Sequence, residues 1–286
     1  MRDNAEVRNG LTSGVARVLL GAAAVFGSYV YACASNVTEA LSLALRGTQA
    51  SAVVLDPGTG AVLASAGETR EGAPGSTIKP LLLAYALEHG IVRPEMQVYC
   101  RRNLHVGGRA LPCTHPPDLP VFTAESALAE SCNTWFAEMA KHFTGPELEA
   151  ALQETHLLHA SLTTANVDQR QLAVLGLAGV SATPLELARA FRELLGRMPT
   201  TGPVAHGLKD SVDYGMAHSA AVAGVTILGK TGTASDGGEA WTHGWFVGAI
   251  PGRVLIVVYV PHGDGADAAR LAQKFFRAIA GAGRAN

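Results

Sequence analysis

A serine and a lysine stand three residues apart, at Ser76 and Lys79, where an apolar stretch follows Pro74 and Gly75. Residues with this spacing share one face of a helix, so the hydroxyl and the amine can approach hydrogen-bond distance. Burial or nearby cations can make a lysine lose its proton, which an arginine does not do. The first turn of a helix also offers free N–H groups that can stabilise an oxyanion. The pattern predicts an activated serine, although a plain helix cap beside a solvated lysine has the same spacing.

A second hydroxyl precedes an amide in the stretch "ESCNTWF", at Ser131 and Asn133. The flanking residues are helical in pattern on both sides, with a break at these two positions. A hydroxyl at such a break can pass on a proton, and an amide can hold both a lysine and a substrate peptide group. In isolation the same residues also fit a simple cap between two helices.

A third group lies in the β-rich run "VTILGKTGTA", where Lys230 is followed by Thr231, Gly232 and Thr233. A cation with two hydroxyls can bind a carboxylate, and a glycine in a strand permits close approach of another backbone. The alternative interpretation without a functional role is an exposed lysine on a strand with a bulge.

Taken in order, S-x-x-K at a helix start, S-x-N at a helix break and K-T-G on a strand form the set found in serine acyl-transferases that react with penicillin. The chain resembles the transpeptidase domain of the penicillin-binding proteins from about Ser51 to Ala280. The segments that carry the resemblance are "VVLDPGTGAVLASA", "PGSTIKP", "ALAESCNTWFAEMA", "ATPLELARAF", "GKTGTA" and "HGWFVGAIP".

The resemblance implies a role for each motif residue. Ser76 would attack the carbonyl carbon of the penultimate D-alanine in a peptidoglycan stem peptide and form an acyl-enzyme. Lys79 would accept the serine proton, and Ser131, with Lys230 behind it, would pass a proton to the leaving D-alanine nitrogen. Asn133 would bind the substrate amide and orient the first lysine.

The third motif would supply the remaining substrate contacts. Thr231 and Thr233, separated by Gly232, would hold the terminal carboxylate of the stem peptide or the carboxylate of a β-lactam. The N–H groups of Ser76 and Thr233 would form the oxyanion hole.

Three other functions remain open on the sequence. A serine β-lactamase of class A needs a glutamate between the second and third motifs, but the stretch "SLTTANVDQRQLAVLGLAGVS" has Asp168 as its sole carboxylate. A D,D-carboxypeptidase would differ only in using water as the acyl acceptor. A sensor or scaffold that is acylated by a β-lactam without turnover is the third alternative. A glycan-polymerising membrane protein is an expected partner, because no polymerising domain precedes the motifs.

The order of elements is a helix, two strands, many helices, three strands and a helix. Two of the strands form a hairpin around Asp56, and Thr183 with Glu186 predicts a capped helix start. Another helix is expected between Asp210 and Ala223. We therefore expect an α/β (α+β) fold with an antiparallel sheet of about five strands. Terminal helices would cover one face, and a helical insertion, about residues 76–223, would cover the other.

The amino terminus has the pattern of an export signal. Arginines precede an uncharged stretch over residues 18–38, and "ACA" offers a cleavage site. Residues 1–34 are thus expected to be a cleaved signal peptide or a membrane anchor, a lipid attachment at Cys33 being the weakest alternative. Residues 35–286 would form the penicillin-binding transpeptidase domain, acting on the outer side of the membrane.

Composition excludes other classes of partner. The net charge of −2 and the lack of a basic run argue against nucleic acid, and no cofactor is implied. Cys100 and Cys113 flank a loop and are interpreted as a disulfide, as free thiols or, last, as a zinc clip with His105 and His115, whose spacing is unlike common zinc motifs.

Overall fold

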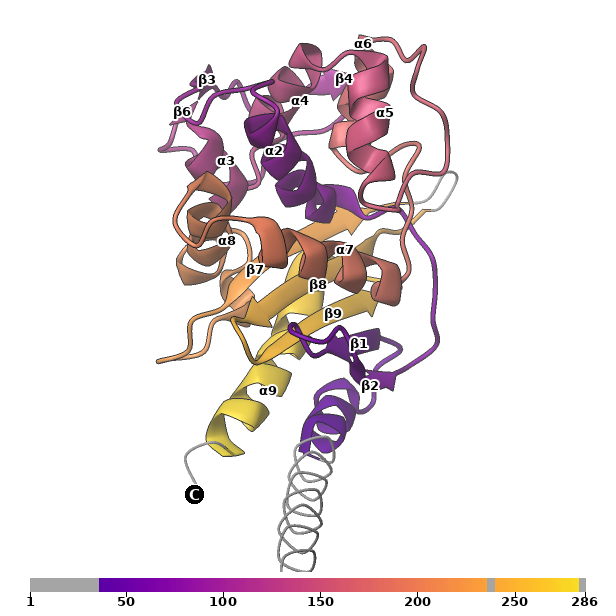
Figure 1. Cartoon of the computed structure of the whole chain (residues 1–286), viewed down its shortest axis with the longest axis vertical. Coiled ribbons are helices and arrows are strands. Elements are labelled where there is room, and N and C mark those ends of the chain that lie inside the picture. The colour runs from indigo at the N-terminus through magenta and orange to yellow at the C-terminus, as the bar shows by residue number, and fades with distance from the viewer. Residues whose placement is uncertain (1–35, 236–239, 283–286) are drawn as a thin grey trace, which may run out of the picture.

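The computed structural model describes residues 36–235 and 240–282. Its centre is a five-stranded antiparallel sheet in the order β2-β1-β9-β8-β7 (Figure 1). The strands are β1 (Ser51–Leu55), β2 (Val62–Ala66), β7 (Leu228–Ala234), β8 (His243–Ile250) and β9 (Val254–Val260). Strands from the two ends of the chain thus meet in one sheet, as the sequence predicts.

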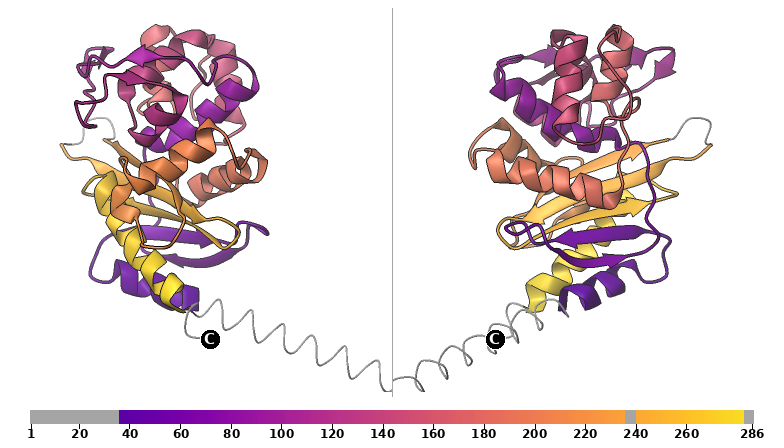
Figure 2. Two further views of the ribbon diagram at one scale, coloured as in Figure 1. Left: turned by 90° about the vertical axis from the view of Figure 1, so that its left-hand side faces the viewer. Right: turned by 45° about the vertical axis from the view of Figure 1, so that its right-hand side comes forward.

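Helices cover both faces of this sheet (Figure 2). Residues 36–45 are helical and lie with α9 (Gly265–Ala282) on one face. On the other face is a helical part built from α2 (Lys79–Glu88), α3 (Ala124–Ala129), α4 (Asn133–His142), α5 (Gly145–Gln153), α6 (Val167–Val174), α7 (Pro184–Arg197) and α8 (Pro203–Asp213). The predicted fold class is confirmed.

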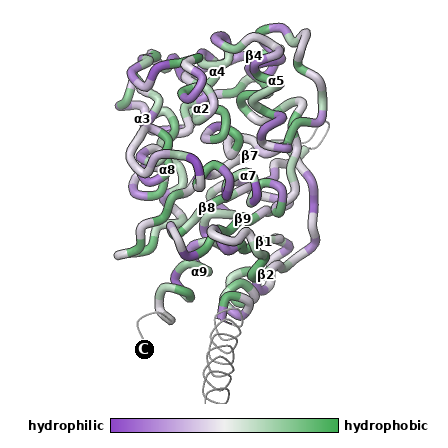
Figure 3. Tube along the Cα trace, viewed as in Figure 1, coloured by the Kyte–Doolittle hydropathy of each residue, from purple (hydrophilic) through white to green (hydrophobic). Residues whose placement is uncertain are grey.

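Alternation along the strands creates the two cores. Val53 and Leu55 of β1 pack with the helical part, whereas Val54 between them packs with α9. Successive side chains of a strand point to opposite faces, so a strand that is apolar at every position is covered on both. Figure 3 shows the apolar colouring of the strands and the hydrophilic segment that leads from β2 towards the helical part.

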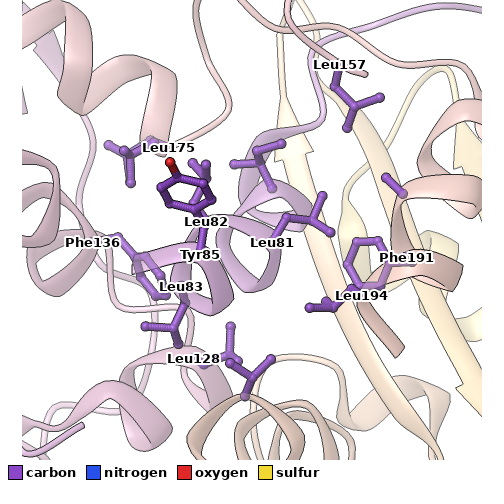
Figure 4. Packing of buried hydrophobic residues seen from close by; sticks show 14 of the residues in the cluster. Leu81, Leu82, Leu83, Tyr85, Leu128, Phe136, Leu157, Leu175, Phe191 and Leu194 are labelled. Atoms are coloured by element: carbon purple, nitrogen blue, oxygen red, sulfur yellow. The ribbon is translucent and has the colours of Figure 1, made fainter. Parts of the chain in front are cut away.

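The helix α2 occupies the middle of the helical part. Its residues Leu81, Leu82 and Leu83 are all buried although they point in different directions around the helix (Figure 4). A helix that is apolar all round is a buried one. Because Lys79 begins this helix, its side chain starts from a buried position.

Local signals in the sequence account for several boundaries. The hairpin turn is fixed by Asp56, whose Oδ1 accepts hydrogen bonds from the N–H groups of Gly58 at 2.9 Å and Thr59 at 2.7 Å. The capping box before α7 is present, with Thr183 and Glu186 each accepting the other's backbone N–H. Both features follow from the side-chain chemistry of turns and caps.

The helix expected between Asp210 and Ala223 is displaced in the structure. The observed helix α8 runs from Pro203 to Asp213, and only the short turn His218–Ala220 follows it. The prediction was wrong because Pro203 suits the first helical position and starts the helix earlier.

The segment between α2 and α3 has little regular structure. It contains four strands of two residues each, β3 (Val98–Tyr99), β4 (His105–Val106), β5 (Arg109–Ala110) and β6 (Val121–Phe122). Among the described residues, no helix is both long and apolar enough to span a membrane. The expected export segment, residues 1–34, and Cys33 lie outside the described residues.

Candidate active site

Ser76 lies on a tight turn that leads directly into α2. A 3₁₀ turn covers Gly75–Ile78, and α2 begins at Lys79. In this geometry residues i and i+3 are eclipsed, so Ser76 and Lys79 lie on the same side of the chain. Gly75 has φ of +53° and donates its N–H to the carbonyl of Gly176 at 3.0 Å. The serine is thus presented at a fixed, glycine-dependent bend.

Lys79 is fully buried and forms three hydrogen bonds with the second motif. Its Nζ donates to the Ser131 carbonyl at 2.9 Å, to Ser131 Oγ at 3.3 Å and to Asn133 Oδ1 at 2.7 Å. Burial lowers the pKa of Lys79 to about 8 because a charged amine loses its hydration. An amine with this pKa exchanges its proton near neutral pH, which the role of a base requires.

The hydroxyl of Ser131 lies between two buried amines. Lys230 Nζ donates to Ser131 Oγ at 2.9 Å and to its neighbour's carbonyl, Thr231 O, at 3.1 Å. Its pKa is lowered well below the usual value, first by burial and then by the charge of Lys79. The structure therefore brings Lys79 of the first motif, Ser131 and Asn133 of the second and Lys230 of the third into one hydrogen-bonded group.

A helix break shapes the second motif as expected. The helix α3 ends at Ala129, and Ser131 adopts a positive φ of +53° before α4 begins at Asn133. Only a few per cent of residues other than glycine adopt this conformation, and such residues are concentrated at functional sites. Asn133 Nδ2 donates to the carbonyl of Pro112 at 3.3 Å. The motif is therefore held from the side of the irregular segment as well.

The third motif approaches the serine through bare backbone. A Cβ added to Gly75 would lie 2.7 Å from Thr233 O, and one added to Gly232 would lie 2.5 Å from Pro74 O. Both distances are too short for any side chain, so the turn of Ser76 and the edge strand β7 must meet at glycines. This contact places the backbone of Thr233 beside the turn that carries Ser76.

The two threonines of the third motif have backbone partners on the α9 side. Thr231 Oγ1 donates to the Met216 carbonyl at 3.3 Å, and Thr233 Oγ1 accepts from the Gly265 N–H at 3.0 Å. Thr231 is buried, whereas Thr233 is exposed. Binding of a carboxylate by these hydroxyls would require them to share or exchange these partners, and it stays a prediction.

Two side chains of β8 fix the chain before the serine. His243 Nε2 lies 2.8 Å from the carbonyl oxygen of Ala73, and Trp245 Nε1 donates to the same oxygen at 3.0 Å. His243 is 1% exposed, so it is a buried residue of the strand.

Sequence reasoning missed Glu130, which directly precedes Ser131. It is 5% exposed, and burial raises its pKa. Its negative charge in turn acts on Lys230 and raises the pKa of that amine. No motif marks this glutamate, because its effect depends on burial that only the fold reveals.

Cys100 and Cys113 are free thiols in the structure, as is Cys132, and all three are buried. The disulfide interpretation is therefore not what the structure shows. The Cys113 and Cys132 sulfurs lie 3.9 Å apart, and this contact lowers the pKa of the Cys113 thiol and raises the pKa of the Cys132 thiol. Residues 236–239, between β7 and β8, lie outside the described residues.

Solved structures share this fold. The D,D-transpeptidase domain of a peptidoglycan glycosyltransferase from Eggerthella lenta is 20% identical, with a TM-score of 0.76 over 87% of this chain and 82% of that one. The transpeptidase domain of penicillin-binding protein 3 from Burkholderia pseudomallei is 19% identical, with a TM-score of 0.73 over 90% of this chain and 95% of that one. A chain from a peptidoglycan synthase complex that coordinates polymerisation and crosslinking is 20% identical, with a TM-score of 0.69 over 90% of this chain and 60% of that one.

No curated protein sequence matches the chain at a significant level. Residues 50–281, by contrast, match the profile of the penicillin-binding protein transpeptidase domain. This match includes all three motifs and nearly the whole described part of the chain. The chain belongs to the penicillin-binding protein transpeptidase domain family.

Proposed function

We propose that the chain is a serine D,D-transpeptidase that cross-links peptidoglycan stem peptides ending in D-Ala-D-Ala and binds penicillin covalently at Ser76. The observation that carries this proposal is the pair of buried amines, Lys79 and Lys230, that share the hydroxyl of Ser131. Such an arrangement can accept a proton at one amine and deliver a proton from the other without a metal or cofactor.

The first half of the reaction forms an acyl-enzyme. Ser76 Oγ bonds to the carbonyl carbon of the penultimate D-alanine, and the bond from that carbon to the nitrogen of the last D-alanine breaks. The serine proton passes to Lys79 and, through Ser131 and Lys230, a proton reaches the leaving nitrogen. The N–H groups of Ser76 and Thr233 stabilise the oxyanion, a kind of contact whose loss costs roughly 10²–10³ in rate.

In the second half an amine of another stem peptide attacks the acyl carbon. The bond to Ser76 Oγ breaks, and the serine regains its proton from the attacking amine through the same groups. We further propose that Asn133 holds the substrate amide and that Thr231 and Thr233, on either side of Gly232, hold the carboxylate of stem peptide or β-lactam.

The segment beside the nucleophile supports transfer to an amine over hydrolysis. A Cβ added to Gly176 would lie 2.1 Å from the carbonyl oxygen of Gly75. The chain around this contact, residues 172–180, reads "LAVLGLAGV" and has no ionisable side chain. Asp168 is exposed at the start of α6, where its Cβ lies near Gly107. A water molecule at the acyl group would thus lack a carboxylate base from this segment.

We place the reaction on the outer side of the cytoplasmic membrane, where stem peptides are cross-linked. The related chain from a complex that coordinates polymerisation and crosslinking supports a glycan-polymerising membrane protein as the partner. Such a partner would bring newly made glycan strands to the site.

Intact-mass measurement with a fluorescent penicillin tests the proposal. The wild type should gain one adduct that persists for hours, Ser76→Ala should gain none, and the control Ser65→Ala, at an exposed position of β2, should label like the wild type. Rapid loss of the label with continuous release of opened penicillin would identify a β-lactamase instead.

A second assay separates transfer from hydrolysis. A synthetic stem peptide ending in D-Ala-D-Ala is incubated with the protein and an amine acceptor, and the products are separated by mass. Cross-linked peptide with release of D-alanine supports the transpeptidase. Release of D-alanine without any cross-linked product would make the protein a carboxypeptidase, and no release from a chain that binds penicillin would leave a sensor.

A further inference from the structure

Four buried side chains with metal-binding atoms converge behind the second motif. They are Cys100, Cys113, His115 and Cys132, and their sulfur and nitrogen atoms all lie within 4.8 Å of one another. The first three belong to the irregular segment between α2 and α3, and the fourth stands between Ser131 and Asn133. This group of three thiols and one imidazole is called the thiol–imidazole cluster below.

The spacing within the thiol–imidazole cluster matches that of a tetrahedral zinc site. Zinc bonds of about 2.3 Å to sulfur and 2.0–2.1 Å to nitrogen imply edges of about 3.8 Å between two sulfurs and about 3.5 Å between sulfur and nitrogen. Cys113 Sγ lies 3.9 Å from Cys132 Sγ, and Cys100 Sγ lies 3.5 Å from His115 Nε2. A disulfide would require sulfurs about 2 Å apart, so the geometry fits shared ligation better than a bond.

The surrounding groups orient these ligands. The Nδ1 atom of His115 lies 2.9 Å from the Pro116 carbonyl, which accepts a hydrogen bond only from a protonated Nδ1. The lone pair is then on Nε2, which faces Cys100. The Thr134 hydroxyl lies 3.4 Å from Cys100 Sγ and 3.6 Å from Cys113 Sγ, where it can donate to a thiolate. Such outer contacts are typical of metal-bound histidine and cysteine.

We propose that the thiol–imidazole cluster binds one zinc ion and that this ion fixes the turn of the second motif to the irregular segment. Three thiolates and an imidazole are soft and borderline ligands that favour zinc over magnesium or calcium. Because four protein ligands close the coordination sphere and all four are buried, the site is structural rather than catalytic.

The position of Cys132 links this site to the proposed active site. Its neighbours Ser131 and Asn133 both contact Lys79. Asn133 also contacts Pro112, next to the ligand Cys113. The strands of the irregular segment are only two residues long. A metal that joins Cys100, Cys113 and His115 to Cys132, at the start of α4, would therefore add a strong link between this segment and α4.

Metal analysis of the full chain tests the proposal without any β-lactam. Protein purified under reducing conditions and without chelator should contain about one zinc per chain, measured by inductively coupled plasma mass spectrometry. After removal of zinc, addition of Co²⁺ should give the strong visible bands of tetrahedral cobalt and sulfur-to-cobalt charge-transfer bands. The cobalt spectrum is taken on the wild type, so it does not depend on whether a variant folds.

Variants locate the ion. Cys100→Ser, Cys113→Ser and His115→Asn should each lower zinc affinity by at least about 10-fold, whereas His105→Asn, an exposed histidine of the same segment, should bind like the wild type. Zinc removal should also slow acylation by penicillin, and zinc addition should restore it.

Several results would overturn the inference. The wild-type protein could take up neither zinc nor cobalt through thiolates. It could instead hold iron in place of zinc, or contain a Cys100–Cys113 disulfide after purification under reducing conditions. Acylation that stays unchanged after zinc is removed would refute the link to the second motif. Because metal content is measured apart from penicillin binding, failure of either proposal leaves the other testable.

Discussion

At the scale of single residues, the candidate site depends on two lysines whose charged forms are destabilised by burial. Lys79 and Lys230 are both fully buried and lie on either side of one hydroxyl. Two ammonium groups so close in a dry environment repel each other, so the pair is stabilised when at least one amine is neutral. A lysine that is partly neutral near pH 8 suits the proposed proton transfer. Burial lowers the pKa of Lys79 to about 8, and burial together with the charge of Lys79 lowers the pKa of Lys230.

This environment predicts the pH dependence of acylation. Lys79 has a pKa of about 8, and only the neutral amine can accept the proton of Ser76. Below pH 8 the protonated fraction grows, so the acylation rate constant should fall, about tenfold per pH unit well below the pKa. Stopped-flow labelling with a fluorescent penicillin between pH 6 and 9 measures it, with circular dichroism as a check on folding. A flat profile would exclude Lys79 as the base.

Replacement of the lysine by arginine separates charge from proton transfer. Lys79→Arg keeps a cation but cannot release its proton, because arginine stays protonated in proteins. We expect the acylation rate to fall by roughly 10²–10⁴, the range of general base catalysis. Lys141→Arg is the matched control, since Lys141 lies on the surface of α4 and pairs with Glu138, and it should react normally. Equal rates for the two variants would contradict the assigned role.

At the scale of elements, the site forms where bare backbones touch. The turn of Ser76 meets β7 at Gly75 and Gly232, and it meets the segment after α6 at Gly176. Each contact leaves no room for a Cβ. Glycines in such positions set the distance between elements, so they position the turn of Ser76 although they have no side chain.

Gly176→Ala should therefore lower the acylation rate of the folded protein by more than its loss of stability would explain. Its Cβ would lie 2.1 Å from the Gly75 carbonyl oxygen, and the turn must move by roughly 1 Å to restore an ordinary contact distance. A displacement of about 1 Å costs roughly 10² in rate, which labelling kinetics measure.

The control is Gly252→Ala. The φ of Gly252 is +69°, close to the +72° of Gly176, but no atom lies within 4 Å of a Cβ added to Gly252. It carries the same backbone strain, about 1–2 kcal/mol, and should acylate at the normal rate. Similar rates in both variants would show that the close approach does not position Ser76.

Elements with strong local signals could be predicted from the sequence. The Asp56 turn, the Thr183 cap and the helix break at Ser131 depend on nearby side chains and were found. The helix α8 starts at Pro203 and not at Asp210, because proline suits the first turn of a helix and the helical pattern after Asp210 is weaker. Local chemistry thus predicts most elements but not every boundary.

The site was predictable in part, because its motifs have fixed spacings. What spacing cannot give is the distance between segments far apart in the chain. The contact of Lys79 with Ser131, the burial of Glu130 and the convergence of Cys132 with Cys100 depend on the complete fold. The sequence suggests a zinc clip of Cys100 and Cys113 with His105 and His115, in a spacing unlike common zinc motifs. In the fold the fourth member is Cys132 in place of His105, and Cys132 lies inside the second motif.

At the scale of the whole molecule, the sheet separates the candidate active site on one face from the α9 layer on the other. One face carries the helical part and the buried lysines Lys79 and Lys230, whereas the other packs against α9 and the helix of residues 36–45. On β8 this division is visible in adjacent residues, because Trp245 packs with the helical part while Phe246 packs with α9. A change deep in the α9 layer should therefore weaken the fold without altering the chemistry.

Phe276→Ala tests this separation. Phe276 is fully buried on α9, and its ring lies 6.3 Å from that of Phe246 in β8. Its truncation should lower the free energy of unfolding by about 3–5 kcal/mol, measured by urea denaturation, while acylation of the folded protein stays close to that of the wild type. Leu43→Ala, at a position 57% exposed, is the control and should change stability by less than about 0.5 kcal/mol. If Phe276→Ala slowed acylation strongly at low temperature, where the protein remains folded, the two faces of the sheet would have to be coupled, and the α9 layer would belong to the catalytic machinery.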